Sequence, residues 1–231
     1  MEAIQYARPS TIEEAVRRLG EAGARVLAGG TDLLVQMRGG MTRPRVIVDI
    51  KGIEQLRRVE RTAQGWRVGA AVAGAELGAD AEFARQWPGV VEAFQLIGST
   101  QIQGRASLGG NLCNASPAAD SVPALIAAGA RCTVAGPQGT REVAVENICI
   151  APGKTSLASG EFVVDFLFAA PPPRTADAYL RFIPRTEMDI AVVGAGVCLT
   201  LDGAGRCTQA RLALCAVAPR ALLGPAAAEG L

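Results

Sequence analysis

Short apolar segments separated by glycine-rich turns constrain the fold of this 231-residue chain more than any other sequence feature. A helix with apolar residues at helical spacing is predicted over Thr11–Glu21, with a capping box at Ser10–Glu13 and its end at Gly23. Three strands and a second helix complete the pattern of the first fifty residues, at Ile4–Ala7, Arg25–Ala28 and Val46–Ile50, and at Leu33–Arg38. This strand–helix–strand order is typical of an α/β unit.

The remaining chain mixes helices and strands on both sides of a proline run, Pro171–Pro173, which is the best domain boundary. Before the run, a long stretch over Gly98–Pro117 is predicted to be irregular. Helices are predicted at Ala75–Gln86, Val90–Ile97 and Pro123–Gly129, and strands at Trp66–Val72, Arg131–Ala135 and Phe162–Phe168. After the run, strands joined by tight turns, one at Asp202-Gly203, are predicted at Ala178–Ile183, Ile190–Leu201 and Thr208–Val217. No complete helix is evident in the tail, Ala218–Leu231.

Composition excludes several classes of function. Apolar residues make up 49% of the chain and charged residues 19%, which indicates a buried core rather than disorder. The net charge of +1 argues against a broad surface for nucleic acid or anionic membrane. Because histidine is absent, the chain cannot supply a histidine base, triad or metal ligand.

The six cysteines contain no C-x-x-C spacing and are predicted to be reduced, buried thiols that behave as small apolar residues. We therefore expect no metal site. The N-terminus lacks the pattern of a signal peptide, and no apolar run reaches membrane-spanning length. These features predict a cytoplasmic protein without stable membrane insertion.

A first diglycine loop, Leu27-Ala28-Gly29-Gly30-Thr31-Asp32-Leu33-Leu34, lies between a predicted strand and a predicted helix. Glycine permits positive φ and lets a ligand approach the backbone, and successive N–H groups at a helix start can bind an anion. Thr31 and Asp32 are natural N-cap residues whose side chains could otherwise meet a ligand hydroxyl. Taken alone, the segment is more simply interpreted as an ordinary capped βα turn.

A second diglycine loop, within Ala106–Asp120, concentrates small and polar residues in an otherwise apolar chain. Its donors and acceptors beside Gly109-Gly110 suit a diphosphate and sugar hydroxyls. Asp120 suits a hydroxyl better than a phosphate, because like charges repel. The alternative interpretation is a polar surface loop.

Together, AGGTDLL and, about eighty residues later, SLGGNLCNASPAAD resemble the paired flavin-binding signature of one family. That family comprises the FAD-binding subunits of molybdenum hydroxylases of the xanthine dehydrogenase and aerobic carbon monoxide dehydrogenase type. The resemblance covers nearly the whole chain, and further matches are Val48-Asp49-Ile50, Val68-Gly69-Ala70, Ile97-Gly98-Ser99, Pro152-Gly153-Lys154-Thr155 and Asp189-Ile190-Ala191.

The resemblance implies an α+β fold of the vanillyl-alcohol-oxidase (PCMH) type, with FAD extended between two domains. An FAD-binding domain would occupy residues 1–173, as two α/β subdomains of about 1–56 and 57–173. A C-terminal domain with a small antiparallel sheet would occupy residues 174–231. Family members usually continue with helices that cover this sheet, so the domain is expected to be shortened and its sheet bare.

The resemblance also implies the residues that contact FAD. The first loop would contribute Leu27, Ala28, Gly29, Gly30, Thr31, Asp32 and Leu33. The second would contribute Ser107, Gly109, Gly110, Asn111, Asn114 and Asp120. Near the isoalloxazine ring, the family alignment places Val163, Tyr179 and Arg181.

Three positions qualify this assignment. Tyr179 can equally be a core or interface tyrosine. Arg181 replaces a usual lysine and cannot give up a proton, which leaves it the stabilisation of an anionic reduced flavin. Gln103-Gly104 stands where family members often have Arg-Asn, so the entry to the second loop is expected to differ.

The implied function is electron relay, with no catalytic residue acting on substrate in this chain. A molybdenum–pterin large subunit would hydroxylate the substrate, and an iron–sulfur subunit with two [2Fe–2S] clusters would pass electrons to FAD here. The acceptor would be NAD⁺, a quinone or oxygen, and the complex a dimer of heterotrimers. Substrate and acceptor remain open.

Two other functions are compatible with the same residues. One is a flavin-free scaffold subunit of the same complex, and the other is a stand-alone FAD reductase of related fold.

Two further motifs resemble nucleotide-binding signatures without meeting their requirements. Val192–Gly196 imitates a dinucleotide fingerprint but is predicted to be a strand, and Gly153-Lys154-Thr155 imitates a P-loop that lacks its first glycine.

Overall fold

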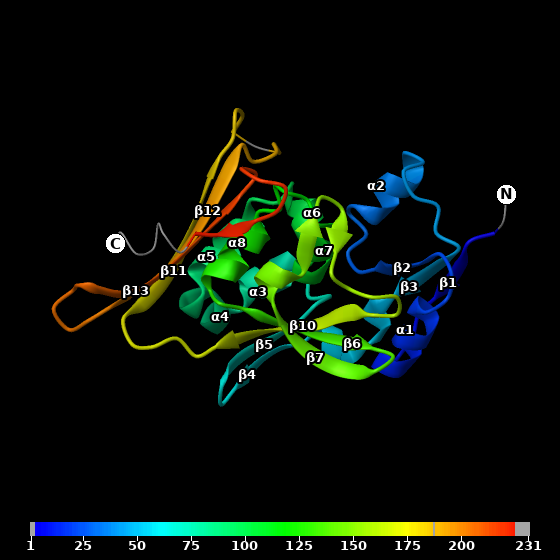
Figure 1. Ribbon diagram of the computed structural model, residues 1–231, viewed down its shortest axis with the longest axis horizontal. Helices are drawn as coiled ribbons and strands as arrows, with labels where there is room; N and C mark the ends of the chain where they lie inside the picture. Colours follow the sequence, from blue (N-terminus) through cyan, green and yellow to red (C-terminus); the bar gives the residue numbers. More distant parts are fainter. Residues whose placement is uncertain (1–2, 187, 225–231) are drawn as a thin grey trace.

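Three main sheets and one small two-stranded sheet form in the computed structural model, which describes residues 3–186 and 188–224 (Figure 1). The first is a parallel sheet of order β1-β3-β2. Its strands are β1 (Gln5–Ala7), β2 (Ala24–Leu27) and β3 (Val46–Asp49). Helix α1 (Ile12–Leu19) packs on this sheet, and α2 (Leu33–Arg38) follows β2.

The ends of α1 differ from the sequence prediction. Thr11, not Ser10, is the N-cap, and its Oγ1 accepts a hydrogen bond from the Glu14 N–H at 3.2 Å. The helix ends at Leu19 with Gly20 as its C-cap, so the prediction of Gly23 was wrong. Acidic residues in the first turn and basic residues in the last turn complement the helix dipole.

The second sheet has the order β4-β5-β10-β6-β7 and is antiparallel throughout. Its strands are β4 (Val59–Thr62), β5 (Gly65–Gly69), β6 (Arg131–Gly136), β7 (Gly139–Ala144) and β10 (Phe162–Ala169). A small two-stranded sheet pairs β8 (Cys149–Ala151) with β9 (Lys154–Thr155). Short 3-10 turns lie at Ile50–Gly52, Glu54–Arg57 and Val145–Asn147.

Six short helices accompany the second sheet, and they contradict the sequence prediction in two regions. They are α3 (Gly74–Ala79), α4 (Ala81–Gln86), α5 (Pro88–Gln95), α6 (Thr100–Gln103), α7 (Leu108–Asn114) and α8 (Ser121–Ala127). The stretch Gly98–Pro117 is therefore not irregular, because α6 and α7 lie within it. The single helix predicted over Ala75–Gln86 is interrupted at Asp80, whose side chain caps α4.

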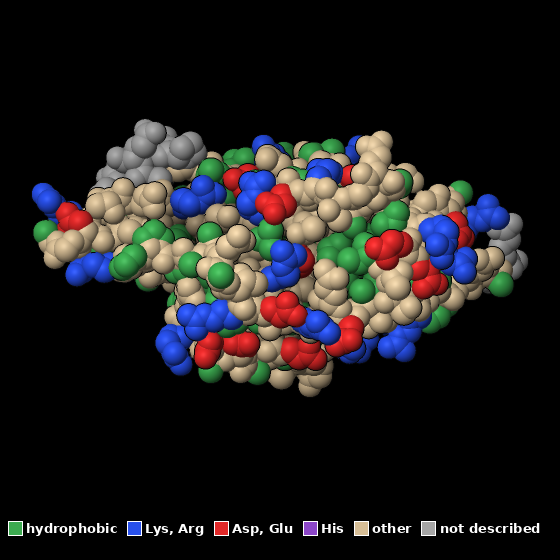
Figure 2. Space-filling view, turned by 90° about the horizontal axis from the view of Figure 1, so that it is seen from below, with side chains coloured by type: hydrophobic (Ala, Val, Ile, Leu, Met, Phe, Trp, Pro, Cys, Tyr) green, Lys and Arg blue, Asp and Glu red, His purple; other side chains and the backbone are tan. Residues whose placement is uncertain are grey.

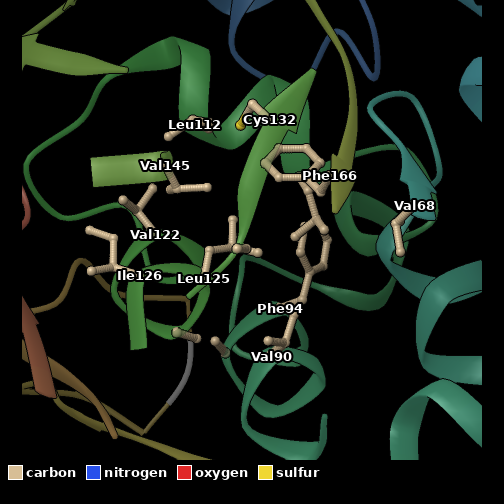
Figure 3. Packing of buried hydrophobic residues seen from close by; sticks show 14 of the residues in the cluster. Val68, Val90, Phe94, Leu112, Val122, Leu125, Ile126, Cys132, Val145 and Phe166 are labelled. Carbon is tan, nitrogen blue, oxygen red and sulfur yellow. The ribbon is translucent and has the colours of Figure 1, made fainter. Parts of the chain in front are cut away.

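Helix α8 lies at the centre of the larger hydrophobic core, where all seven of its residues are buried. Its side chains Val122, Leu125 and Ile126 lie in the same cluster as Phe94 of α5 and Phe166 of β10 (Figure 3). A second cluster joins α1 and the parallel sheet to β10 through Phe162 and Val164. The strand β10 thus links the two parts of the FAD-binding region predicted from the sequence.

The third sheet, of order β11-β12-β13-β14, is antiparallel and packs on α5 and α8 (Figure 1). Its strands are β11 (Thr175–Phe182), β12 (Val193–Leu201), β13 (Cys207–Cys215) and β14 (Leu222–Leu223). The hairpin at Asp202-Gly203 is confirmed. The strand predicted over Ile190–Leu201 begins later, at Val193, so Val193–Gly196 form a strand as predicted and Val192 precedes it. A Cβ at Gly196 would overlap the Pro123 backbone, so this glycine permits close packing of β12 on α8. Of the predicted tail, residues 225–231 lie outside the described residues.

Charges of both signs are mixed on the face seen in Figure 2. Lysine and arginine side chains alternate there with aspartate and glutamate. Among the residues that the structure describes, no helix is both long and apolar enough to cross a membrane.

Asp177 of β11 fixes the third sheet to α5. Its Oδ2 accepts a hydrogen bond from the Val90 N–H at 3.1 Å, and the Gly89 N–H donates a second to its carboxylate. Asp177 thereby caps the start of α5, where the N-cap residue, Trp87, makes no side-chain capping hydrogen bond. The Asp177 Oδ1 is buried without a hydrogen-bond partner in the described part of the chain. Burial raises the pKa of Asp177 to about 6, hydrogen bonds from the backbone amides of Gly89, Val90 and Asp177 itself oppose this rise, and Glu92 adds to it.

This arrangement predicts a pH-dependent stability. Because the pKa of Asp177 in the folded protein lies above its ordinary value of 3.8, the folded state binds the proton more tightly than the unfolded chain. Stability should therefore fall as pH rises from about 4 to about 6, by at most about 3 kcal/mol. In urea titrations across this range, Asp177→Asn should flatten the dependence; parallel curves for both proteins would contradict the assignment.

Candidate functional site

The first diglycine loop connects β2 to α2 and presents a row of free amides. Leu27 ends β2, residues 28–32 form the turn, and Leu33 begins α2. Gly30 has φ +81°, a conformation that favours glycine. Within the described chain, the N–H groups of residues 29–33 donate to no protein acceptor. Five successive donors without protein partners can bind an anion that approaches the loop.

The side chain of Asp32 does not cap α2, contrary to the N-cap interpretation. Asp32 occupies the N-cap position but makes no capping hydrogen bond, and it is exposed. Thr31 is half-buried beside it. The loop therefore leaves both its amides and the Asp32 carboxylate available to a ligand.

The second diglycine loop is the start of α7, and most of its amides are already used. Ser107 is the N-cap, and its Oγ accepts from the Gly110 N–H at 3.2 Å. Gly109 donates to the Ala70 carbonyl at 3.2 Å, and Asn111 donates to the Ser107 carbonyl at 2.9 Å. A Cβ added at Gly110 would meet only the Ser107 Oγ, at 3.3 Å. This loop thus offers close approach at Gly110 rather than a row of free donors.

The two loops are in direct contact. A Cβ at Gly29 would overlap the carbonyl group of Arg105 and the Cα of Ala106, the residues that precede Ser107. The Gln36 Nε2 of α2 also donates to the Asn114 Oδ1 of α7 at 2.9 Å. The elements appear side by side in Figure 1, with α2 in blue and α7 in green. One molecule can therefore contact both loops.

The polar residues that follow α7 connect the second loop to the third sheet. The Ser121 hydroxyl donates to Asn111 Oδ1 at 2.7 Å. Next to Ser121, Asp120 accepts hydrogen bonds from the Tyr179 hydroxyl at 2.7 Å and from Arg181 Nη1 at 3.1 Å. Both donors belong to β11, so Asp120 joins α8 to the third sheet.

This trio is buried, and its charges compensate one another. The side chains of Arg181 and Asp120 are 4% and 10% exposed. Burial raises the pKa of Asp120, while the hydrogen bonds from Tyr179 and Arg181 oppose the rise. Burial also raises the pKa of the Tyr179 hydroxyl, which is kept as a donor. Arg181 further donates to the Leu96 carbonyl at 2.9 Å, which fixes its guanidinium.

Val163 lies apart from the loops' exposed surface. It is 3% exposed on β10, in the core cluster that also contains Leu108 and Leu112 of α7. Its predicted proximity to a flavin ring stays a prediction. Tyr179 and Arg181 lie together, as expected, but their partners are Asp120 and backbone carbonyls of the protein.

Sequence reasoning missed Gln36 and Ser121, which hold Asn114 and Asn111. No signal in the sequence singles out these partners, because both pairs form only when α2, α7 and α8 pack. It also assigned no role to Lys51, whose Nζ donates to the Ala28 carbonyl of the first loop at 2.5 Å.

The cysteines have the environment of packed thiols. Burial raises the pKa of Cys113 to about 12 and that of Cys149 to about 11, so both remain protonated near neutral pH. Cys132, Cys149 and Cys215 are buried, and all six are free. In the described part of the chain, no three acidic, cysteine or histidine side chains are grouped to hold a metal.

Comparison with known proteins assigns the chain to a family. Residues 2–168 match the family described as FAD binding domain in molybdopterin dehydrogenase, and residues 178–231 match CO dehydrogenase flavoprotein C-terminal domain. The chain is 33% identical to the xanthine dehydrogenase FAD-binding subunit of Escherichia coli O157:H7, across 93% of this chain and 74% of that protein. It is 30% identical to the carbon monoxide dehydrogenase medium chain of Hydrogenophaga pseudoflava, across 94% and 76%.

Solved structures of related proteins support the same family assignment. Carbon monoxide dehydrogenase from Hydrogenophaga pseudoflava superimposes with a TM-score of 0.93 at 30% identity, covering 99% of this chain and 79% of that chain. Quinoline 2-oxidoreductase from Pseudomonas putida 86 gives 0.87 at 27% identity, covering 96% and 76%. The chain therefore belongs to the family of FAD-binding subunits of molybdenum-containing dehydrogenases, and the expected family and α+β fold are confirmed.

The two loop glycines are predicted to differ in how much stability an alanine substitution costs. In Gly29→Ala the new Cβ must displace the Arg105 backbone, so the free energy of unfolding should drop by about 1–3 kcal/mol. In Gly110→Ala the Cβ meets open space apart from Ser107 Oγ, and alanine is the better helix former, so stability should change by less than about 1 kcal/mol. Urea unfolding measures the free energy of unfolding of both variants. Equal losses of stability would show that the loops do not depend on the contact between Gly29 and the Arg105 backbone.

Proposed function

We propose that this chain binds FAD across the two diglycine loops and serves as the electron-relay subunit of a molybdenum hydroxylase complex. The observation that carries the proposal is the row of free amides at residues 29–33, in contact with a second loop in which an added Gly110 Cβ would meet only the Ser107 Oγ, at 3.3 Å. Family membership supplies the identity of the nucleotide.

The residues present fit the diphosphate of FAD. Amides of the first loop would hold the phosphate oxygens, because they have no protein acceptor and need no displacement of existing hydrogen bonds. Gly110 would allow the nucleotide to approach α7 without a side chain in its way. Ser107 would support it indirectly, since its hydroxyl is buried and fixes the start of α7.

Asp120 is proposed here as a positioning residue rather than as a direct ligand of a sugar hydroxyl. Both of its oxygens already accept hydrogen bonds from β11. The Arg181 guanidinium is paired with Asp120 and also donates to the Leu96 carbonyl, so Asp120 fixes the junction between α5 and the third sheet.

When bound, FAD supplies the chemistry of accepting electrons and passing them to another acceptor. The proposed donors are two [2Fe–2S] clusters of an iron–sulfur subunit, fed by a molybdenum–pterin subunit. The proposed acceptor is NAD⁺, a quinone or oxygen, and the proposed assembly is a dimer of heterotrimers. The name "medium chain" of a relative supports a multi-subunit complex.

Two features support the proposed setting. Leu180 and Phe182 on the outward face of β11 are 77% and 62% exposed, and large exposed apolar side chains that cluster are typical of contacts with partner subunits. The free cysteines support a reducing compartment, and we propose the cytoplasm.

The test is the flavin content of the purified protein with its partners. Wild-type protein should carry FAD, identified by its visible absorption and by chromatography of the released nucleotide. Gly110→Asp should abolish retention, because the side chain and its charge would occupy the approach to α7.

Gly203→Asp is the matched control, since Gly203 lies in the β12–β13 turn with no atom within 4 Å of an added Cβ. It should retain flavin fully. Stoichiometric FAD in Gly110→Asp would refute the assignment of the second loop. A wild-type complex without flavin would refute the relay function and favour a scaffold.

A further inference from the structure

A charged cluster lies under the first loop, at the end of β3. Lys51 Nζ donates to Asp49 Oδ1 at 2.7 Å and to the Ala28 carbonyl oxygen at 2.5 Å. The Tyr6 hydroxyl donates to the other carboxylate oxygen, Asp49 Oδ2, at 2.7 Å. Tyr6 of β1 and Asp49 of β3 are thus linked through Lys51 to the Ala28 carbonyl, which follows β2.

The cluster is built rather than accidental. The Asp49 and Lys51 side chains are 8% and 21% exposed. Asp49 also accepts from the Lys51 N–H at 3.0 Å, so it starts the turn that carries Lys51 back beneath the loop. Burial alone would raise the pKa of Asp49, but the hydrogen bonds from Lys51 and Tyr6 hold it below its usual range. The carboxylate therefore stays charged and keeps Lys51 in place.

The geometry of the peptide bond transmits this anchor to the amide of Gly29. The chain has no cis peptide bond in its described part. In a planar trans peptide the C=O and the following N–H point in opposite directions. With its carbonyl directed at Lys51, the Ala28–Gly29 peptide must direct the Gly29 N–H to the opposite side of the loop. That N–H has no protein acceptor within the described chain.

We propose that Tyr6, Asp49 and Lys51 form a positioning strut that orients the Ala28–Gly29 peptide, so that the Gly29 amide is preset to bind the diphosphate of a nucleotide. The inference rests on the proposed function, since it names how that site is preorganised. Lys51 acts through Ala28 and is not itself a phosphate ligand, because Asp49 and the Ala28 carbonyl already hold its ammonium group. Preorganised donors bind more tightly, because the loop loses less freedom on binding.

The experiment titrates flavin-stripped full-length chain with FAD, with ADP, which shares the diphosphate, and with riboflavin, which lacks it. In Lys51→Met the peptide loses its anchor, and binding of FAD and of ADP should each weaken about tenfold, the effect of one charge-assisted hydrogen bond. Binding of riboflavin should be unchanged. Lys51→Arg should restore much of the loss, because it retains a cationic donor.

Two further variants separate the strut from a direct phosphate ligand. Asp49→Asn removes the charge that holds the Lys51 ammonium group. If Lys51 acts by positioning the Ala28 carbonyl, ADP should bind more weakly to this variant. If Lys51 instead contacts the phosphate directly, the loss of its counter-ion should make ADP bind more tightly. Tyr6→Phe removes one hydroxyl from a side chain that is 60% exposed, so it should fold normally and weaken ADP binding about two- to threefold.

Arg67→Met is the matched control. Arg67 Nη1 pairs with Asp165 Oδ2 at 2.6 Å in the second sheet, so its loss should lower the melting temperature without changing ADP affinity. Wild-type affinity for ADP in Lys51→Met, equal loss of riboflavin, or tighter ADP binding in Asp49→Asn would overturn the strut. Wild-type protein that binds no FAD would instead overturn the proposed function, so the two failures are distinguishable.

Discussion

The contact of Gly29 with the Arg105–Ala106 backbone is the constraint on which the candidate site depends. It joins the turn after β2, in the parallel sheet, to the start of α7, in the second part of the FAD-binding region. Any side chain at Gly29 would separate the two loops. Because the contact is between main chains, its geometry does not vary with side-chain rotamers, and the Gln36–Asn114 hydrogen bond adds a second link close by.

The two diglycine loops are not equivalent. The first loop has amides without protein acceptors. In the second loop the amides donate to Ala70 and Ser107, and Gly110 leaves room for a ligand because it has no side chain. The backbone donors without protein acceptors are therefore concentrated in the first loop. The third sheet completes this arrangement from the other side, since Asp120 accepts from Tyr179 and Arg181 and Asp177 accepts from the start of α5.

Much of the architecture could be predicted from local patterns. The strands at Arg25–Ala28, Val46–Ile50 and Phe162–Phe168, the hairpin at Asp202-Gly203 and the family itself were found with little error. The errors lie where short-range signals compete. Glycines and small residues made the region of α6 and α7 look irregular, although the Ser107 cap and packing on the core stabilise α7 as a helix. Thr11 rather than Ser10 caps α1, because the choice between adjacent hydroxyls depends on backbone angles.

The sequence by itself determined three things about this protein. It placed glycines at the two turns of the candidate nucleotide site, it excluded histidine chemistry, and it supplied the apolar segments that form the sheets. Those follow from local chemistry and from motifs read in order. Only the tertiary structure decided which amides are free, that Asp120 is engaged by β11, and that Lys51 holds the Ala28 carbonyl. These partners are distant in the chain or belong to different elements, so the hydrogen bonds between them exist only once the sheets and helices have packed.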